Sequence, residues 1–256
     1  MDEISGNSRE RFFVVCAGRT GSTLLAAALG DAGADFAMPV PESWDTGTGD
    51  MEHRAIQRAT HHLYQAHRIC PEKPLGRIDR YRWDLHRHRA KTQIKRILAE
   101  ARYVKSDNLD LAVHPAFQQG YFPRVILNYR RFEHHALSLF QMRGHSSIDW
   151  LSGIYNRVYG NGMMLLFLYG GCVVPYADLV DPEQDSWAGE LAEVTGCSAD
   201  TIRESRTRRS QSSGETADHP VLDQTAHELF RTMEGLKGRV FPASPQALRS
   251  WRARKS

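Results

Sequence analysis

The segment that most constrains this fold lies near the N-terminus, where an apolar run is followed by a glycine-containing turn and an Ala/Leu-rich stretch. Phe12 to Val15 is aromatic and β-branched, which predicts a buried strand, and residues 22–32 predict a helix. Gly18 and Gly21 allow the connecting backbone to turn tightly and to approach a ligand closely. Because backbone N–H groups and the positive end of the helix dipole then point the same way, the segment predicts a phosphate site.

The side chains of the turn narrow the choice of phosphate ligand. Arg19 supplies a fixed positive charge, and hydroxyl groups follow at positions 20, 22 and 23. A Walker A loop has lysine directly after its second glycine, whereas here Ser22 follows Gly21 and the cation lies two places upstream. The loop is therefore a poor candidate for a Mg-ATP site. The alternative is an ordinary strand-to-helix turn that carries an arginine by chance.

The rest of the chain alternates short apolar strands with helices. The pattern predicts strands at 12–17, 102–105, 124–129 and 172–175, and helices at 22–32, 51–69, 84–101, 132–142, 149–169, 182–194 and 221–233, with a helical turn at 114–120. This alternation is typical of an α/β protein with a mainly parallel sheet flanked by helices. We expect a single domain over 1–256, with a core at about 11–200, a mobile Ser/Arg/Thr-rich loop at 203–219, and a C-terminal helix with a frayed basic tail at 220–256.

Composition limits the classes of function. The chain has 256 residues, 41% of them hydrophobic and 25% charged, which is ordinary for a soluble globular protein. A net charge of +3 is too small to predict nucleic-acid binding, and no apolar run reaches membrane-spanning length. The first residues are acidic and polar, unlike a secretory signal, and the four cysteines form no CxxC pair. We therefore expect a cytoplasmic protein with reduced thiols and no metal site.

A second basic element follows the strand at 124–129. Arg130 comes directly after that strand, and Ser138 lies eight residues later in the following helix. A guanidinium group can bind two oxygens of a dianionic phosphate, and a nearby hydroxyl adds a donor. The pair predicts a second phosphate site, with a basic strand end and an unremarkable helix serine as the alternative.

These two elements resemble the motifs of the sulfotransferases that use 3′-phosphoadenosine 5′-phosphosulfate (PAPS). Arg19-Thr20-Gly21-Ser22-Thr23 is similar to their 5′-phosphosulfate loop, [KR]-[ST]-G-[ST]-[ST], and Arg130 with Ser138 to their Arg-x7-Ser element for the 3′-phosphate. Residues 173–179 resemble a late strand-to-helix segment, so the resemblance covers about 11–200. The family's Asp-Pro after the arginine is replaced by Arg131-Phe132, and its late RKGxxGDW segment is absent.

The resemblance implies a P-loop NTPase-like three-layer sandwich, PAPS as co-substrate, 3′,5′-ADP as product, and no metal. The donor-binding residues that it implies are Arg19, Thr20, Gly21, Ser22, Thr23, Leu24, Arg130 and Ser138, joined by Arg208 and Arg209 from the late basic loop.

The resemblance also nominates residues for the chemical step. Arg19 would meet the bridging oxygen of the leaving group, and Lys105 would be a second cation near the sulfonate. For the base, Glu42 lies in a Pro-flanked loop similar to that of the trehalose-type enzymes. Asp107 in Lys105-Ser106-Asp107 stands where cytosolic sulfotransferases have histidine, and His114 is a third candidate. For Glu42 and Asp107 the alternative is a solvated loop acid.

The sequence thus leads to the expectation of a cytoplasmic enzyme that sulfates a hydroxyl group of a small molecule, glycan or lipid. Two alternatives stay open. One is a non-catalytic nucleotide-binding protein of the same fold, and the other is a P-loop phosphotransferase, which would need Mg²⁺. The sequence does not identify the acceptor, and it leaves open whether two copies form a homodimer.

Overall fold

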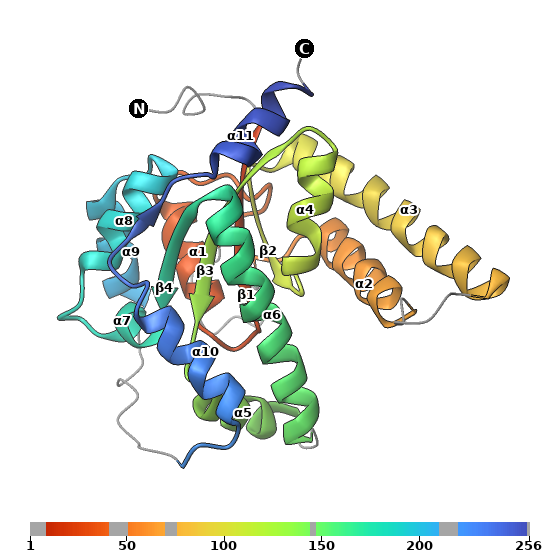
Figure 1. The fold of residues 1–256 in the computed structure, drawn as a ribbon. Coiled ribbons are helices and arrows are strands. Elements are labelled where there is room, and N and C mark those ends of the chain that lie inside the picture. Colours follow the sequence, from red (N-terminus) through yellow and green to blue (C-terminus); the bar gives the residue numbers. More distant parts are fainter. Residues whose placement is uncertain (1–8, 41–50, 70–75, 144–146, 210–219, 255–256) are drawn as a thin grey trace.

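A single five-stranded sheet forms the centre of the protein (Figure 1). The computed structural model describes residues 9–40, 51–69, 76–143, 147–209 and 220–254. The strands are β1 (Glu10–Cys16), β2 (Tyr103–Asp107), β3 (Phe122–Tyr129), β4 (Gly171–Pro175) and β5 (Val240–Phe241). Their order is β2-β1-β3-β4-β5, and every neighbouring pair is parallel except β4 with β5. The predicted α/β class with a mainly parallel sheet is confirmed.

Helices cover both faces of this sheet (Figure 1). They are α1 (Ser22–Asp31), α2 (Arg54–Ile69), α3 (Arg77–Glu100), α4 (Asp110–Gln118), α5 (Phe132–Arg143), α6 (Ile148–Tyr169), α7 (Tyr176–Val180), α8 (Ser186–Thr195), α9 (Ala199–Arg209), α10 (Gln224–Glu234) and α11 (Pro245–Arg252). Side chains alternate along β1, so Phe12 and Val14 pack beneath α1 and α8, whereas Phe13 and Val15 face α4 and α6. The two apolar cores explain why the strands read as continuous hydrophobic runs.

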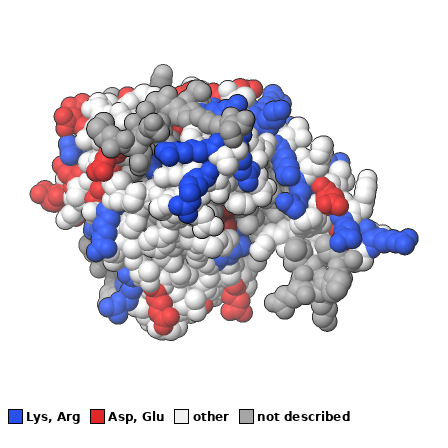
Figure 2. All heavy atoms as spheres, turned by 45° about the horizontal axis from the view of Figure 1, so that its top comes forward, with Lys and Arg blue, Asp and Glu red and all other residues white. Residues whose placement is uncertain are grey.

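Helices α2 and α3 pack against one another and project from the β2 side of the sheet (Figure 1). They join the sheet through the apolar side chains that line one face of each helix, such as Ile56 and Ile94. On the face shown in Figure 2, Lys and Arg side chains lie in several separate groups, with acidic side chains beside some of them. No helix among the described residues is both long enough and apolar enough to cross a bilayer.

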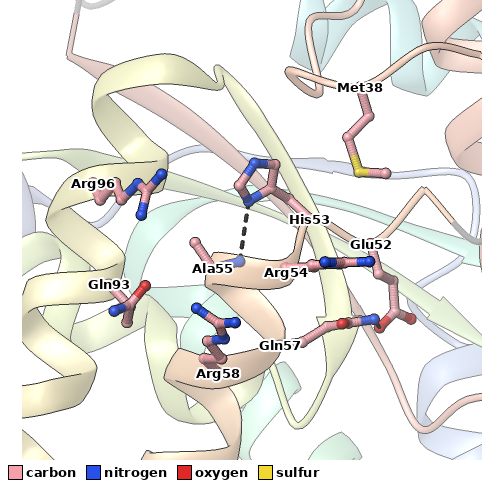
Figure 3. A pocket seen from close by; sticks show the side chains of 9 residues that line it. All are labelled: Met38, Glu52, His53, Arg54, Ala55, Gln57, Arg58, Gln93 and Arg96. Atoms are coloured by element: carbon pink, nitrogen blue, oxygen red, sulfur yellow. Dashed lines mark hydrogen bonds between the residues drawn. The ribbon is translucent and has the colours of Figure 1, made fainter.

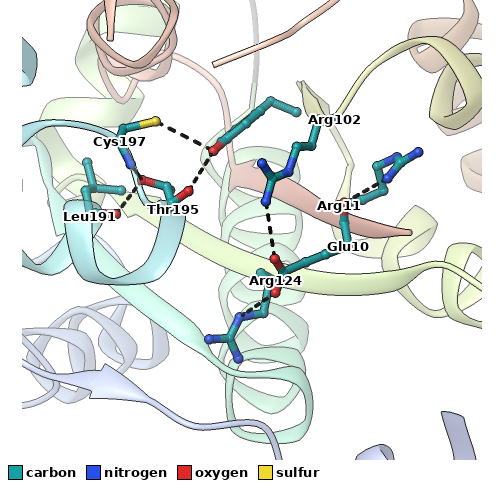
Figure 4. Close-up of polar contacts among 8 residues, drawn as sticks. Glu10, Arg11, Arg102, Arg124, Leu191, Thr195 and Cys197 are labelled. Atoms are coloured by element: carbon teal, nitrogen blue, oxygen red, sulfur yellow. Dashed lines mark hydrogen bonds and ion pairs between the residues drawn. The ribbon is translucent and has the colours of Figure 1, made fainter. Parts of the chain in front are cut away.

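Two arginines form ion pairs with a buried carboxylate near the amino ends of the strands (Figure 4). Glu10 on β1 is 5% exposed and lies 3.4 Å from an Nη atom of Arg102 and 3.6 Å from Nε of Arg124. Burial raises the pKa of Glu10, and the two arginines oppose that shift. Nearby, the Tyr103 hydroxyl donates to the carbonyl oxygen of Thr195. This end is therefore structural, and the opposite edge is where a parallel sheet presents ligand-binding residues.

Three expectations about the second half of the chain are wrong. Residues 203–209 belong to α9 rather than to a mobile loop, because Ile202 and Ser205 are buried and the Ser205 hydroxyl donates to Asp31 of α1. The remainder of that predicted loop, 210–219, lies outside the described residues. The frayed tail is replaced in part by α11, which buries Trp251. Helix formation after β4 begins at α7 rather than at residue 182.

Candidate functional site

Four neighbouring strands end at one edge of the sheet, and the predicted site residues follow them. The loop at 17–21 follows β1, Asp107 ends β2, Arg130 follows β3, and Tyr176 follows β4. The parallel register pairs Val14 with Lys105 and brings these carboxyl ends level. Residues that are more than 150 positions apart in the sequence therefore meet at the start of α1.

The loop after β1 has a strained, left-handed backbone. Gly18, Arg19 and Gly21 have φ angles of 81°, 49° and 73°. Arginine pays roughly 1–2 kcal/mol for such a φ, which is typical of functional turns held by their surroundings. A β-carbon at Gly21 would lie 2.6 Å from the ring of Tyr176, so only glycine fits there. Gly21 caps α1, and the first turn of this helix has no acidic residue, which leaves its dipole available to an anion.

Buried hydrogen bonds from β3 and the helices behind it hold this loop in place. The Thr20 hydroxyl donates to Oδ1 of Asn128 at 2.7 Å, and Asn128 is itself anchored by its Nδ2, which donates to the carbonyl oxygen of Val174. His135 on α5 lies with Nδ1 3.0 Å from the carbonyl oxygen of Gly18. Thr20, Asn128 and His135 are each fully buried. The loop is therefore preorganised by hydrogen bonds to buried groups of the core.

The second predicted element lies against the first. Arg130 donates from Nη1 to the carbonyl oxygen of Arg19 at 3.1 Å, and Nε of Arg19 donates to Oγ of Ser138 at 3.2 Å. The Arg130 guanidinium also stacks over the Tyr176 ring, with 4.3 Å between its carbon and the ring centroid. The two elements that the sequence predicts to bind phosphate groups are therefore in direct contact. Two guanidinium groups and the Ser138 hydroxyl are thus brought together beside the start of α1.

On the other side of the loop, a buried cation joins it to a carboxylate. Lys105 on β2 is 3% exposed, and its Nζ donates to Oγ1 of Thr23 at 3.0 Å and lies 3.2 Å from Oε1 of Glu52. The other oxygen of Glu52 accepts from the Ser106 hydroxyl at 3.4 Å. Asp107 is exposed and adjoins the loop, since a β-carbon on Gly18 would lie 3.0 Å from its Oδ1. The positive charge of Lys105 is therefore directed at the first turn of α1.

Other predicted residues are not part of this cluster. Glu42 lies outside the described residues, as do the side chains of Arg208 and Arg209 on α9. Arg206, from the same basic stretch, is buried and donates to Asp181 and Asp185, so it does not close over a ligand. The base candidate His114 lies on α4 with Nδ1 2.7 Å from the Tyr169 hydroxyl, at the end of α6 that leads into the start of β4. Because that end of the sheet is opposite the loop, His114 is a wrong assignment.

Sequence reasoning missed several residues that the fold brings to the loop. Glu52, Asn128, His135 and Tyr176 all contact it or its partners. Asn128 could have been identified from the sequence, because a polar side chain inside the apolar run of β3 needs a buried hydrogen-bond partner. Glu52 could not have been identified from the sequence, since it precedes α2 in a polar stretch and contacts Lys105 only through tertiary packing.

Comparison of the chain with protein-family models, with curated proteins and with solved structures gives no match. The geometry of the cluster is therefore the basis for a functional assignment.

Proposed function

We propose that this protein is a PAPS-dependent sulfotransferase with a P-loop NTPase-like three-layer fold. The observation that carries the proposal is the contact between its two predicted phosphate elements, with Arg130 3.1 Å from the Arg19 carbonyl and Ser138 3.2 Å from the Arg19 side chain. A nucleotide with phosphate groups at both its 3′ and 5′ positions needs two cationic sites separated by no more than its own span, and these contacts keep Arg19 and Arg130 within that span. The hydroxyl-rich loop, which lacks a lysine after Gly21, favours a phosphosulfate over Mg-ATP.

The chemistry is an in-line displacement at sulfur. The acceptor oxygen attacks sulfur, the bond from sulfur to the 5′-phosphate oxygen breaks, and its electron pair stays on the departing 3′,5′-ADP. Negative charge grows on that oxygen, where the α1 amides, Arg19 and Lys105 provide stabilisation. A carboxylate accepts the proton of the acceptor hydroxyl. Candidates for this base are Glu42 and Asp107 from the sequence, and Glu52, which the fold brings beside Lys105.

Binding of 3′,5′-ADP tests the donor site directly. We expect Arg130→Ala to weaken binding by roughly 2–4 kcal/mol, as for a broken charged pair, when it is measured by isothermal titration calorimetry. Arg89→Ala removes the same charge from an exposed position on α3 and serves as the control. Equal affinities in the two variants would refute the assigned site.

Turnover separates the proposal from the other two functions. We expect release of 3′,5′-ADP from PAPS with hydroxyl acceptors, whereas nucleotide binding without turnover indicates a non-catalytic protein, and Mg²⁺-dependent phosphoryl transfer from ATP indicates a phosphotransferase. Loss of the base lowers kcat by about 100-fold or more. Comparison of Glu42→Gln, Glu52→Gln and Asp107→Asn then identifies which carboxylate acts.

A further inference from the structure

A basic cavity of about 590 Å³ lies between α2 and α3, beside the phosphate loop. Glu52 lines this cavity and also contacts Lys105, whose Nζ is 3.0 Å from the Thr23 hydroxyl. The Glu52–Lys105 ion pair therefore connects the cavity to the first turn of α1. The volume falls within the ~300–1,000 Å³ range of small-molecule sites.

The walls of the cavity carry more positive than negative charge. Arg54 and Arg58 are four residues apart on α2, and Gln93 and Arg96 are three apart on α3, so each pair shares one helix face. Figure 3 shows Arg58, Gln93 and Arg96 on one side of the cavity and Glu52 and Met38 on the other. Glu52 is the one carboxylate in the described lining, and it is already paired with Lys105.

These arginines have few partners within the protein. In the described part of the chain, neither Arg54 nor Arg58 forms a hydrogen bond or ion pair, and Arg96 has a single contact at 3.9 Å with exposed Glu100. Like charges four residues apart on a helix destabilise it. The first turn of α2 lines the same cavity and has no acidic residue, so the helix dipole adds positive potential. A bound anion would offset this repulsion.

A buried polar atom in the cavity also lacks a partner. Oε1 of Gln93 is inaccessible to solvent and accepts no hydrogen bond within the described residues. An unpaired buried carbonyl oxygen costs about 1–3 kcal/mol. Rotation of the Gln93 amide toward the cavity would let a hydroxyl donor on a ligand pair with this oxygen and recover that cost. The cavity thus combines anion-binding groups at Arg54, Arg58 and Arg96 with an acceptor for a hydroxyl group.

We infer that this cavity binds the acceptor substrate, and that the acceptor is a small polyhydroxylated molecule carrying a phosphate or carboxylate group. This inference rests on the proposed sulfotransferase function. The anionic group lies among the arginines, and a hydroxyl at the other end of the molecule faces Glu52 and the loop. The arrangement selects against neutral acceptors because they leave the guanidinium groups without a counter-charge.

The test uses three sugars of one ring size, namely glucose, glucose 6-phosphate and glucuronate. Each is titrated into the full-length protein by calorimetry, with and without saturating 3′,5′-ADP. We expect at least one anionic sugar to bind about tenfold or more tightly than glucose, as for a charge-assisted contact. A preference for the phosphate over the carboxylate, or the reverse, identifies the anionic group.

Variants that remove arginine charges test whether the preference for an anionic sugar arises in the cavity. The Arg54→Ala/Arg58→Ala double variant should reduce the preference for the anionic sugar to about twofold or less, the loss expected when charge-assisted bonds are removed. The Arg68→Ala/Arg89→Ala double variant removes two exposed charges from the same helices outside the cavity lining and should keep the preference. Equal or absent binding of all three sugars, or a preference that survives in the first double variant, overturns the inference. Failure of 3′,5′-ADP to bind instead overturns the proposed function, while anionic-sugar binding still tests the cavity.

Discussion

The buried imidazole of His135 makes the stability of the loop depend on pH. Its Nδ1 lies 3.0 Å from the Gly18 carbonyl oxygen, which can only accept, so Nδ1 carries the proton of the neutral ring. Nε2 is buried and has no hydrogen-bond partner in the described part of the chain. Burial lowers the pKa of His135 from 6.5 to about 4, and the bond to Gly18 opposes this shift. Protonation therefore places an unpaired charge in the core.

The direction in which stability changes with pH follows from the difference in His135 protonation between the folded and unfolded states. Between pH 6.5 and about 4 the unfolded chain binds a proton that the folded protein excludes, so stability falls as pH decreases through this window. The contribution of His135 is complete above pH 6.5. The difference between the two pKa values removes about 2 kcal/mol from the free energy of unfolding by pH 5 and about 3 kcal/mol by pH 4.

Urea unfolding between pH 8 and pH 4 measures this effect by comparison of the wild type with His135→Asn and His135→Gln. Neither amide titrates, so both variants should lose about 3 kcal/mol less than the wild type over that range. Asn places its N–H where Nδ1 lies, whereas Gln places it near Nε2, so we expect only His135→Asn to retain the wild-type affinity for 3′,5′-ADP. Curves that stay parallel within about 1 kcal/mol would refute this reasoning, because that is less than one pKa unit of difference.

Three further substitutions test how the loop is held. Gly21→Ala puts a methyl group 2.6 Å from the Tyr176 ring, at a position with a φ of 73°. We expect thermal unfolding to show that the free energy of unfolding falls by about 2 kcal/mol or more. An unchanged stability would contradict the left-handed turn. Thr20→Val removes the hydroxyl that donates to Oδ1 of Asn128 at 2.7 Å and leaves that oxygen unpaired. Chemical denaturation should show that the free energy of unfolding falls by about 1–3 kcal/mol, and Thr20→Ser should recover most of this loss. Glu52→Ala removes the carboxylate that lies 3.2 Å from Nζ of Lys105, which is 3% exposed. We expect about 3 kcal/mol of destabilisation, and a neutral result would show that this ion pair contributes nothing to stability.

Much of the cluster proposed to bind the donor was predictable because its motifs are local. Residues 18–23 and 130–138 are short segments, and each directly follows an apolar run that predicts a strand. Once a parallel sheet is inferred, the carboxyl ends of its strands must lie at one edge. Proximity of Arg130 to the loop is then a consequence of topology, and the structure confirms it at 3.1 Å.

Elements that depend on tertiary contacts were predicted less well. The stretch RESRTRR has the composition of a loop, but α9 forms because the buried side chains of Ser205 and Arg206 hydrogen-bond to neighbouring segments. Strand β5 has two residues, too few for a periodic signal. The start of helix α11, by contrast, could have been predicted from the sequence, because Ser244 is its N-cap and Pro245 lies in its first turn.

The cavity proposed to bind the acceptor could not be predicted, and the reason is physical. Arg54 and Arg58 alone predict a solvated basic stripe on α2, and the same is true of Arg96 on α3. Packing of the two helices places these guanidinium groups around one cavity and aligns that cavity with Glu52 and Lys105. The proposed donor site is thus encoded in contiguous motifs, whereas the proposed acceptor cavity arises from the spacing between two helices. Changes in the α2–α3 packing should therefore alter acceptor choice while leaving 3′,5′-ADP affinity unchanged.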